Sequence, residues 1–209
     1  MIEKEKIKFT LPKGSLEKIN KKKILELLKK ENNRSILAKL SDDVVFDYLD
    51  LVQNSNFLKL FYLEYDNKII AYAITSAKPE YLISEFKTLK IKIFLSLVSN
   101  LRIITLFNIF ISILNIDMIF LKKENLNKIK ESLNLNLIAV ENEYQSKGIG
   151  KFFLQRIISH YREIGKPKYM TCETYDKRAI KFYLDKCGFK IIGKKIRVPK
   201  NLQILEYKF

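Results

Sequence analysis

Two glycines two residues apart, Gly148 and Gly150, stand between a predicted buried strand at residues 135–140 and a predicted amphipathic helix at residues 148–164. Glycine lets the backbone turn tightly and leaves its N–H groups accessible. Together with a helix N-terminus, such N–H groups bind anions. The neighbouring side chains of Lys147 and Lys151 add positive charge. The loop therefore suits a phosphate or diphosphate, although the same pattern also occurs in turns that bind nothing.

A second amphipathic helix is predicted at residues 177–187. Gly188 follows it in the position that favours a left-handed residue. Asp176 directly precedes the helix, where a carboxylate can cap free backbone N–H groups. Tyr183 lies on the helix, and its spacing alone fits a core tyrosine as well as a functional one. Ala179 lies one turn before Tyr183 on the same helix.

Together the two segments resemble the signature of the GNAT superfamily of acyl-CoA N-acetyltransferases. The first block of that signature is matched by Gln145, Gly148 and Gly150, and the second by Ala179, Tyr183, Gly188 and Phe189. Residues 137–140 resemble the family's fourth strand, and residues 61–73 resemble its second and third strands. Asp176 stands where the family usually has Asn.

The resemblance implies an α/β fold, the GNAT acetyltransferase fold. Its sheet is mixed, mostly antiparallel, and splayed between strands 4 and 5. A single GNAT domain would cover residues 1–209. The link between strands 3 and 4, which is a short helix in the family, spans residues 78–134 here. We expect this link to be a helical hydrophobic insertion within the domain.

The resemblance also implies acetyl-CoA as cosubstrate, and an acceptor that attacks the thioester directly in a ternary complex. Pantetheine would lie against Ile138, Ala139 and Val140, and the N–H group of Val140 would stabilise the oxyanion. Asp176 would place a carboxylate near the cofactor. The loop that would hold the pyrophosphate comprises Gln145, Ser146, Lys147, Gly148, Ile149, Gly150 and Lys151.

In the implied mechanism Tyr183 protonates the departing thiolate. A charged amine must first lose a proton, and a carboxylate acting through water is the expected base. Glu141 and Glu173 are the catalytic candidates, because Glu141 follows the fourth strand and Glu173 lies on the fifth. Either residue is equally explained as a solvated carboxylate.

Charge narrows the classes of partner. The net charge of +16 favours anionic partners, but no nucleic-acid motif accompanies the lysines, so we expect no nucleic-acid binding. A lone histidine and two distant cysteines predict no metal site and reduced thiols. We expect a small-molecule amine acceptor, anionic in character, such as an amino sugar or sugar nucleotide. A protein N-terminus or lysine, or a non-catalytic acyl-CoA-binding module, are the alternatives.

The stretch 91–121 is dominated by apolar residues. Residues 103–116 carry no charge, but as a helix they span only about 21 Å of a hydrocarbon core about 30 Å thick. Three roles stay open: an extra core layer, a homodimer or partner interface, and docking on a membrane surface. With a charged N-terminus that lacks a signal peptide, we expect a cytoplasmic protein, peripheral at the membrane in the third case. A polar stripe runs through Arg102, Thr105, Asn108, Ser112 and Asn115.

Overall fold

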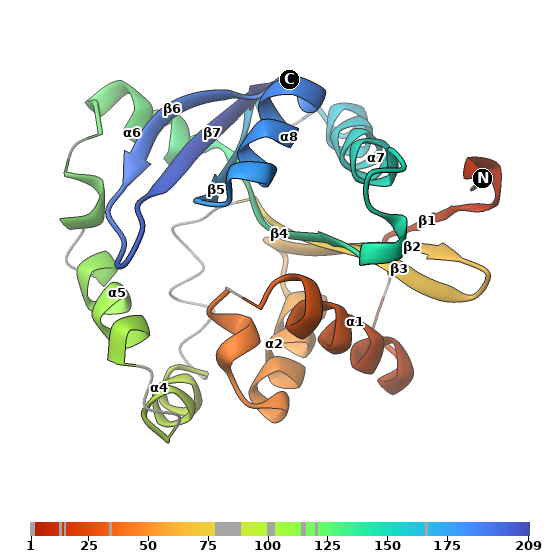
Figure 1. The fold of residues 1–209 in the computed structure, drawn as a ribbon, viewed down its shortest axis with the longest axis horizontal. Helices are drawn as coiled ribbons and strands as arrows, with labels where there is room; N and C mark the ends of the chain where they lie inside the picture. The colour runs from red at the N-terminus through yellow and green to blue at the C-terminus, as the bar shows by residue number, and fades with distance from the viewer. Residues whose placement is uncertain are drawn as a thin grey trace.

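The computed structural model describes residues 3–12, 14, 16–33, 35–77, 89–99, 103–113, 116–119, 121–165 and 167–209. Across these ranges seven strands form one sheet in the order β1-β2-β3-β4-β5-β7-β6 (Figure 1). Every neighbouring pair is antiparallel except β4 and β5, which are parallel. This mixed α/β sheet confirms the predicted fold class. The strands are β1 (Lys8–Thr10), β2 (Leu58–Tyr65), β3 (Lys68–Ser76), β4 (Leu133–Val140), β5 (Tyr169–Thr174), β6 (Lys190–Lys195) and β7 (Leu202–Lys208).

Helices cover both faces of the sheet (Figure 1). One face carries α1 (Lys18–Glu31) and α2 (Asp42–Asn54), and the other carries α7 (Ile149–Glu163) and α8 (Lys177–Cys187). Two short 3-10 segments, η2 (Leu37–Lys39) and η6 (Asn142–Tyr144), lie in the connections.

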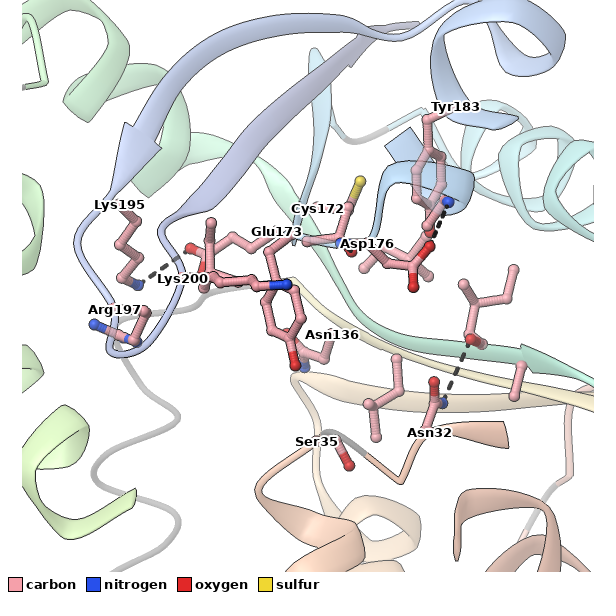
Figure 2. A pocket seen from close by; sticks show the side chains of 18 of the residues that line it. Asn32, Ser35, Asn136, Cys172, Glu173, Asp176, Tyr183, Lys195, Arg197 and Lys200 are labelled. Carbon is pink, nitrogen blue, oxygen red and sulfur yellow. Dashed lines mark hydrogen bonds and ion pairs between the residues drawn. The ribbon is translucent and has the colours of Figure 1, made fainter. Parts of the chain in front are cut away.

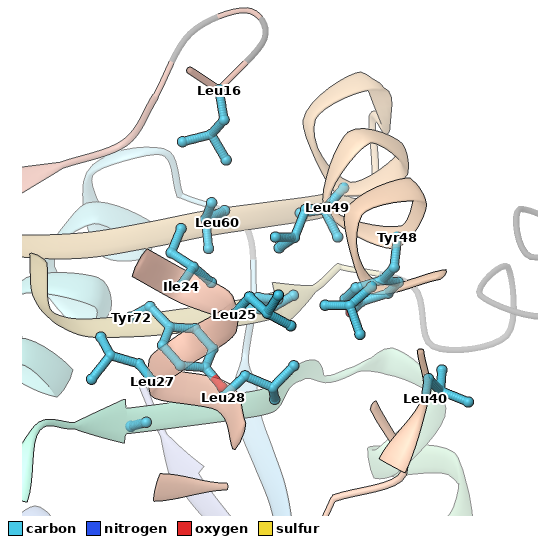
Figure 3. Packing of buried hydrophobic residues seen from close by; sticks show 14 of the residues in the cluster. Leu16, Ile24, Leu25, Leu27, Leu28, Leu40, Tyr48, Leu49, Leu60 and Tyr72 are labelled. Atoms are coloured by element: carbon cyan, nitrogen blue, oxygen red, sulfur yellow. The ribbon is translucent and has the colours of Figure 1, made fainter. Parts of the chain in front are cut away.

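The core divides into two clusters because successive strand residues point to opposite faces. Leu60 and Tyr72 pack under α1 and α2, where Figure 3 shows them beside Leu28 and Leu49. Phe61 lies in the other cluster, together with side chains of α7. Each fully buried Leu or Phe contributes about 1.5–3 kcal/mol to folding.

The β2–β3 hairpin is set by its two-residue turn. Asp66 and Asn67 both have positive φ, 48° and 58°. Such a turn matches the twist of the flanking strands, and Asp and Asn tolerate its backbone better than other residues. Residues 61–73, which resemble the second and third strands of the family, lie within this hairpin, and β2 pairs with β3 from Leu58 to Tyr65.

Two details of the N-terminal part of the chain differ from a regular strand and a side-chain-capped helix. Residues 4–10 are not one strand, because η1 (Lys4–Lys6) is a 3-10 turn that precedes β1. Ser41 occupies the N-cap position of α2, but its side chain makes no capping bond. Its backbone N–H instead donates to Ser96 Oγ at 3.0 Å, which ties α2 to the next segment.

Four helical segments lie in the described part of the connection from β3 to β4: α4 (Lys90–Ser99), α5 (Ile103–Ile113), η5 (Ile116–Met118) and α6 (Lys123–Glu131). Arg102 and Asn115 of the expected polar stripe lie outside the described residues. Of the rest, Thr105 is buried, and Asn108 and Ser112 bond to other parts of the chain. Among the described residues no helix is long and apolar enough to cross a membrane.

Candidate active site

The sheet opens between β4 and β5. These strands pair only where Leu133 to Leu135 face Met170 to Cys172. Beyond that point β4 follows β3 as far as Val140, while β5 follows β7 as far as Thr174. The divergence leaves a cleft of about 2410 Å³, larger than the roughly 300–1,000 Å³ of an ordinary small-molecule site. The cleft therefore has room for two ligands at once.

The free edge of β4 presents backbone groups to this cleft. The carbonyl oxygen of Ile138 accepts from Asn32 Nδ2 at 3.4 Å, and that of Val140 accepts from Gln145 Nε2 at 2.8 Å. Both carbonyls therefore point away from β3. Within a strand the N–H and C=O of one residue point to the same edge. The N–H groups of Ile138 and Val140 consequently lie on the edge that faces the gap.

The loop after β4 has the backbone expected of an anion site. Ser146 and Gly148 have φ values of 61° and 79°, and Gly148 is the N-cap of α7. Alternating left-handed residues turn successive N–H groups toward a common point. A Cβ added at Gly150 would lie 3.4 Å from Phe182 Cζ, so the first turn of α7 packs closely on α8.

Helix α1 also contacts this loop, although the two segments are far apart in the sequence. Gln145 Nε2 donates to Glu31 Oε2 at 2.9 Å, and the Asn142 N–H donates to Glu31 Oε1 at 3.1 Å. One carboxylate thus fixes two points of the connection between β4 and α7. Glu31 was not predicted as a site residue, because only the folded chain brings it near Gln145.

The N-terminus of α8 meets the same loop. Asp176 Oδ1 accepts from the N–H groups of Arg178 and Ala179 at 2.9 and 3.1 Å, which confirms it as the helix cap. Arg178 Nη2 lies 3.3 Å from Ser146 Oγ as donor. A guanidinium therefore stands beside the left-handed loop, together with the ammonium group of Lys151, another residue of the cleft wall.

Most of the predicted site residues line the cleft, but three do not. Ile149 is fully buried in the core, Lys147 lies 5.9 Å from the ring centre of Tyr144, and Glu141 lies 3.7 Å from Lys30. The predicted residues on the cleft wall are Ile138, Ala139, Val140, Gln145, Ser146, Gly148, Gly150, Lys151, Glu173, Asp176 and Tyr183.

Tyr183 stands at the base of the cleft, close to Cys172 (Figure 2). Burial raises the pKa of the Tyr183 hydroxyl well above its usual value of 10.0, and the thiols of Cys172 and Cys187 raise it further. A hydrogen bond joins Tyr183 and Cys172. Tyr183 is consequently protonated at neutral pH and available as a proton donor.

The end of the cleft away from the loop holds a network of four charges, and Figure 2 shows three of them, Glu173, Lys195 and Arg197. Glu173 Oε1 lies 3.1 Å from Lys195 Nζ, and Asp117 Oδ2 lies 3.6 Å from Lys195 Nζ and 2.7 Å from Arg197 Nη1. Burial of Asp117 would raise its pKa, but hydrogen bonds from Ser112 and Arg197 and the charge of Lys195 hold that pKa below 3.8. Two cations here balance two carboxylates.

Sequence reasoning missed the contribution of Asp117 to this end of the site. One signal was present, because Asp117 is the single charged residue between positions 103 and 121. A lone carboxylate in an apolar stretch is stable when buried only if it has charged or hydrogen-bonding partners. Nothing in the sequence marks Asn32 as a site residue. Its hydrogen bond to the Ile138 carbonyl forms because the C-terminal end of α1 lies beside β4.

The cleft as a whole is positively charged. Among the residues that the structure describes, ten basic and five acidic side chains line it, and this surplus of basic groups favours anionic ligands. Among the described residues no group of three His, Cys, Asp or Glu side chains is arranged to hold a metal ion.

Comparisons with known proteins agree with this geometry. Residues 124–189 match the model of the acetyltransferase (GNAT) family. No curated protein matches the chain at a significant level. An agmatine N-acetyltransferase in its apo form superposes with a TM-score of 0.63 at 10% identity, covering 97% of this chain and 100% of that one.

Two further solved structures share the fold. The ribosomal-protein-S18-alanine N-acetyltransferase of Escherichia coli has a TM-score of 0.58 at 14% identity, with 97% of this chain and 93% of that chain covered. An N-acetyltransferase from Staphylococcus aureus Mu50 has a TM-score of 0.57 at 13% identity, with 97% and 98% covered.

Proposed function

We propose that the chain is an acetyltransferase of the GNAT type, as the match of residues 124–189 to that family's model supports, and that it moves an acetyl group from acetyl-CoA to the amine of a small anionic acceptor. The observation that carries the proposal is the splay of β4 from β5. Where the two strands diverge, one cleft is lined by the free edge of β4, by Tyr183 and by most of the loop at residues 145–151.

The residues present fit a coenzyme A thioester. The loop around Gly148 offers backbone N–H groups to a pyrophosphate, and Lys151 and Arg178 supply positive charge beside it. The Ile138 N–H would pair with the amide-containing pantetheine arm. When bound, acetyl-CoA supplies an activated acetyl group and a thiolate leaving group.

The proposed reaction is direct transfer. The neutral amine attacks the thioester carbonyl carbon, a C–N bond forms, and the C–S bond breaks. The Val140 N–H, at the end of β4, donates to the carbonyl oxygen as it becomes negative. The attacking nitrogen loses a proton as the amide forms, and this proton restores the Tyr183 hydroxyl after Tyr183 has given its own proton to the departing sulfur. Burial keeps that proton in place before the reaction.

Glu173 is the proposed base, acting through water on the ammonium form of the acceptor. It lines the cleft, and Lys195 holds its carboxylate in position at 3.1 Å. Glu141 is the less favourable candidate, because it does not line the cleft.

Charge supports a small anionic acceptor over a basic peptide. The basic surplus on the cleft wall repels lysine-rich segments and attracts phosphate or carboxylate groups. An amino sugar or sugar nucleotide has such groups together with an amine. A protein N-terminus is the second acceptor class to test, and a binding module without activity is disfavoured by Tyr183 and Glu173 in one cleft.

The donor site can be tested with two matched glycine variants. Gly148 and Gly165 both have positive φ, 79° and 69°, so Ala at either position costs similar backbone strain. Only Gly148 lies in the loop. Acetyl-CoA at about 100 times its dissociation constant should stabilise the wild type by about 2.7 kcal/mol, a shift of several degrees.

We expect this thermal shift in the wild type and in Gly165→Ala, and we expect it to be lost in Gly148→Ala. Equal shifts in the two variants would place the donor elsewhere. Release of free thiol from acetyl-CoA with a panel of sugar-nucleotide amines and peptides then identifies the acceptor class. No thiol release with any acceptor, despite binding, would favour the binding-module alternative.

A further inference from the structure

Helix α4 exposes its apolar side chains. Ile91, Phe94, Leu95 and Val98 are between 43% and 73% exposed. The opposite side of the helix carries Leu97, which is buried against α2 and the first core cluster. The helix is therefore anchored by one side and leaves an apolar side in water.

Helix α5 shows the same arrangement more sharply. Ile103, Ile104, Phe107 and Phe110 are between 50% and 71% exposed. An ordinary surface helix turns its apolar side to the core and its polar side to solvent. On α5 most of the large apolar side chains face outward instead.

Hydrogen bonds fix this orientation of α5. Asn108 Nδ2 donates to the Val198 carbonyl at 2.8 Å, and Asn108 Oδ1 accepts the Val198 N–H at 2.9 Å. One turn further along, Ser112 Oγ donates to Asp117 Oδ2 at 2.7 Å. The polar stripe is thus used to attach the helix to the β6–β7 connection, and the apolar side is held outward.

We call the eight exposed apolar side chains of these two helices the α4–α5 face. Among the described residues, eight of the fourteen large apolar side chains that are exposed belong to it. α4 and α5 contact each other at one edge of the molecule (Figure 1). Clustered exposed apolar surface of this kind marks an interaction site.

The charge of the protein indicates which kind of partner binds the α4–α5 face. Neither helix contains an acidic residue, and Lys200 is exposed beside α5 in the β6–β7 connection. Lys92 on α4 is also exposed, although its ammonium group pairs with Asp47 of α2 at 2.6 Å. The whole chain carries a net charge of +16. A second copy would bring two such charges together, whereas an anionic bilayer attracts basic residues near its surface. We infer that the α4–α5 face docks on the surface of an anionic phospholipid bilayer.

Docking rather than insertion follows from the length of the helices. No described helix is long enough to span a bilayer, and short apolar helices that bind membranes lie at the headgroup boundary. Ile103 and Ile104 also line the cleft. The docked bilayer would therefore lie beside one end of the active site.

The test is co-sedimentation of the full chain with vesicles of phosphatidylcholine alone or of phosphatidylcholine mixed with phosphatidylserine. We expect binding to the mixed vesicles, weakened by high salt and by omission of phosphatidylserine. The double variant Phe107→Gln/Phe110→Gln should bind about tenfold more weakly or worse, because it removes two aromatic groups from the apolar face. Neither phenylalanine lines the cleft.

The matched control is Ile19→Gln/Ile164→Gln, which changes two exposed apolar residues, one on α1 and one at the C-cap of α7, and should bind like the wild type. A second variant, Phe94→Gln/Leu95→Gln, tests α4. Circular dichroism and the acetyl-CoA thermal shift verify folding of each variant. Absence of binding to mixed vesicles, or equal binding by all variants, would overturn the proposal. A wild-type dimer that Phe107→Gln/Phe110→Gln dissociates, without vesicle binding, would assign the face to a second copy.

Discussion

Arg197 Nη1 lies 2.7 Å from Asp117 Oδ2, and the Asp117 side chain has no exposed surface. This pair joins η5 to the strand connection that carries Lys195 and, through Lys195, to Glu173 on β5. An ion pair between the insertion and the sheet therefore lies next to the proposed base.

Asp117→Asn should lower stability at neutral pH by about 3–5 kcal/mol, because it leaves Arg197 and Lys195 without their shared carboxylate. The pKa of Asp117 is lower in the folded state than its usual 3.8. Its contribution is therefore present above that value and is lost as the pH falls through the folded pKa. Urea titrations should show a gap between wild type and variant at pH 7 that narrows below pH 3.8. The exposed variant Glu131→Gln is the control and should change little.

Tyr183→Phe should reduce kcat by about 10–100-fold and leave the KM for acetyl-CoA nearly unchanged, because a thiol needs little help to leave. Since the Tyr183 pKa is raised well above 10.0, the wild-type rate should show no alkaline decline from this residue below about pH 10. Steady-state kinetics across pH check both statements. A variant with full activity would remove Tyr183 from the proton transfer.

The second half of the chain was predictable because its signals are local. The helix at residues 177–187 has the predicted bounds, and the pair Gly148 and Gly150 at the start of α7 is recognised without reference to any distant residue. Asp176 at a helix start is likewise a local signal, and its capping bonds are present.

The remaining parts of the site depend on contacts between distant segments. Asn32 reaches Ile138 across 106 positions, and Glu31 reaches Gln145 across 114. No periodicity or motif encodes such pairs. The orientation of α5 could not be predicted from the sequence either. A polar stripe on a helix is expected to face solvent, and its contact with the Val198 backbone is known only from the folded chain.

Glu173→Gln tests the proposed base against Glu141→Gln. We expect Glu173→Gln to lower kcat/KM by about 100-fold at neutral pH, since the ammonium acceptor must then lose its proton to bulk water. The loss should shrink as pH rises toward the pKa of the acceptor amine. Glu141→Gln should stay within a few-fold of the wild type. The reverse ranking in pH–rate profiles would transfer the role to Glu141.

Glu31→Ala tests whether α1 positions the pyrophosphate loop. The change removes the acceptor of both the Gln145 side chain and the Asn142 N–H. The loop must then be ordered when the donor binds, and the affinity for acetyl-CoA should fall by about fivefold, as expected for the loss of about 1 kcal/mol of hydrogen bonding. Because Glu31 does not contact the reacting atoms in the proposed mechanism, kcat at saturating donor should be nearly unchanged. Isothermal titration calorimetry and steady-state kinetics separate these effects. Glu26→Ala, an exposed change on the same helix, is the matched control. Equal affinity in both variants would show that the loop is ordered without Glu31.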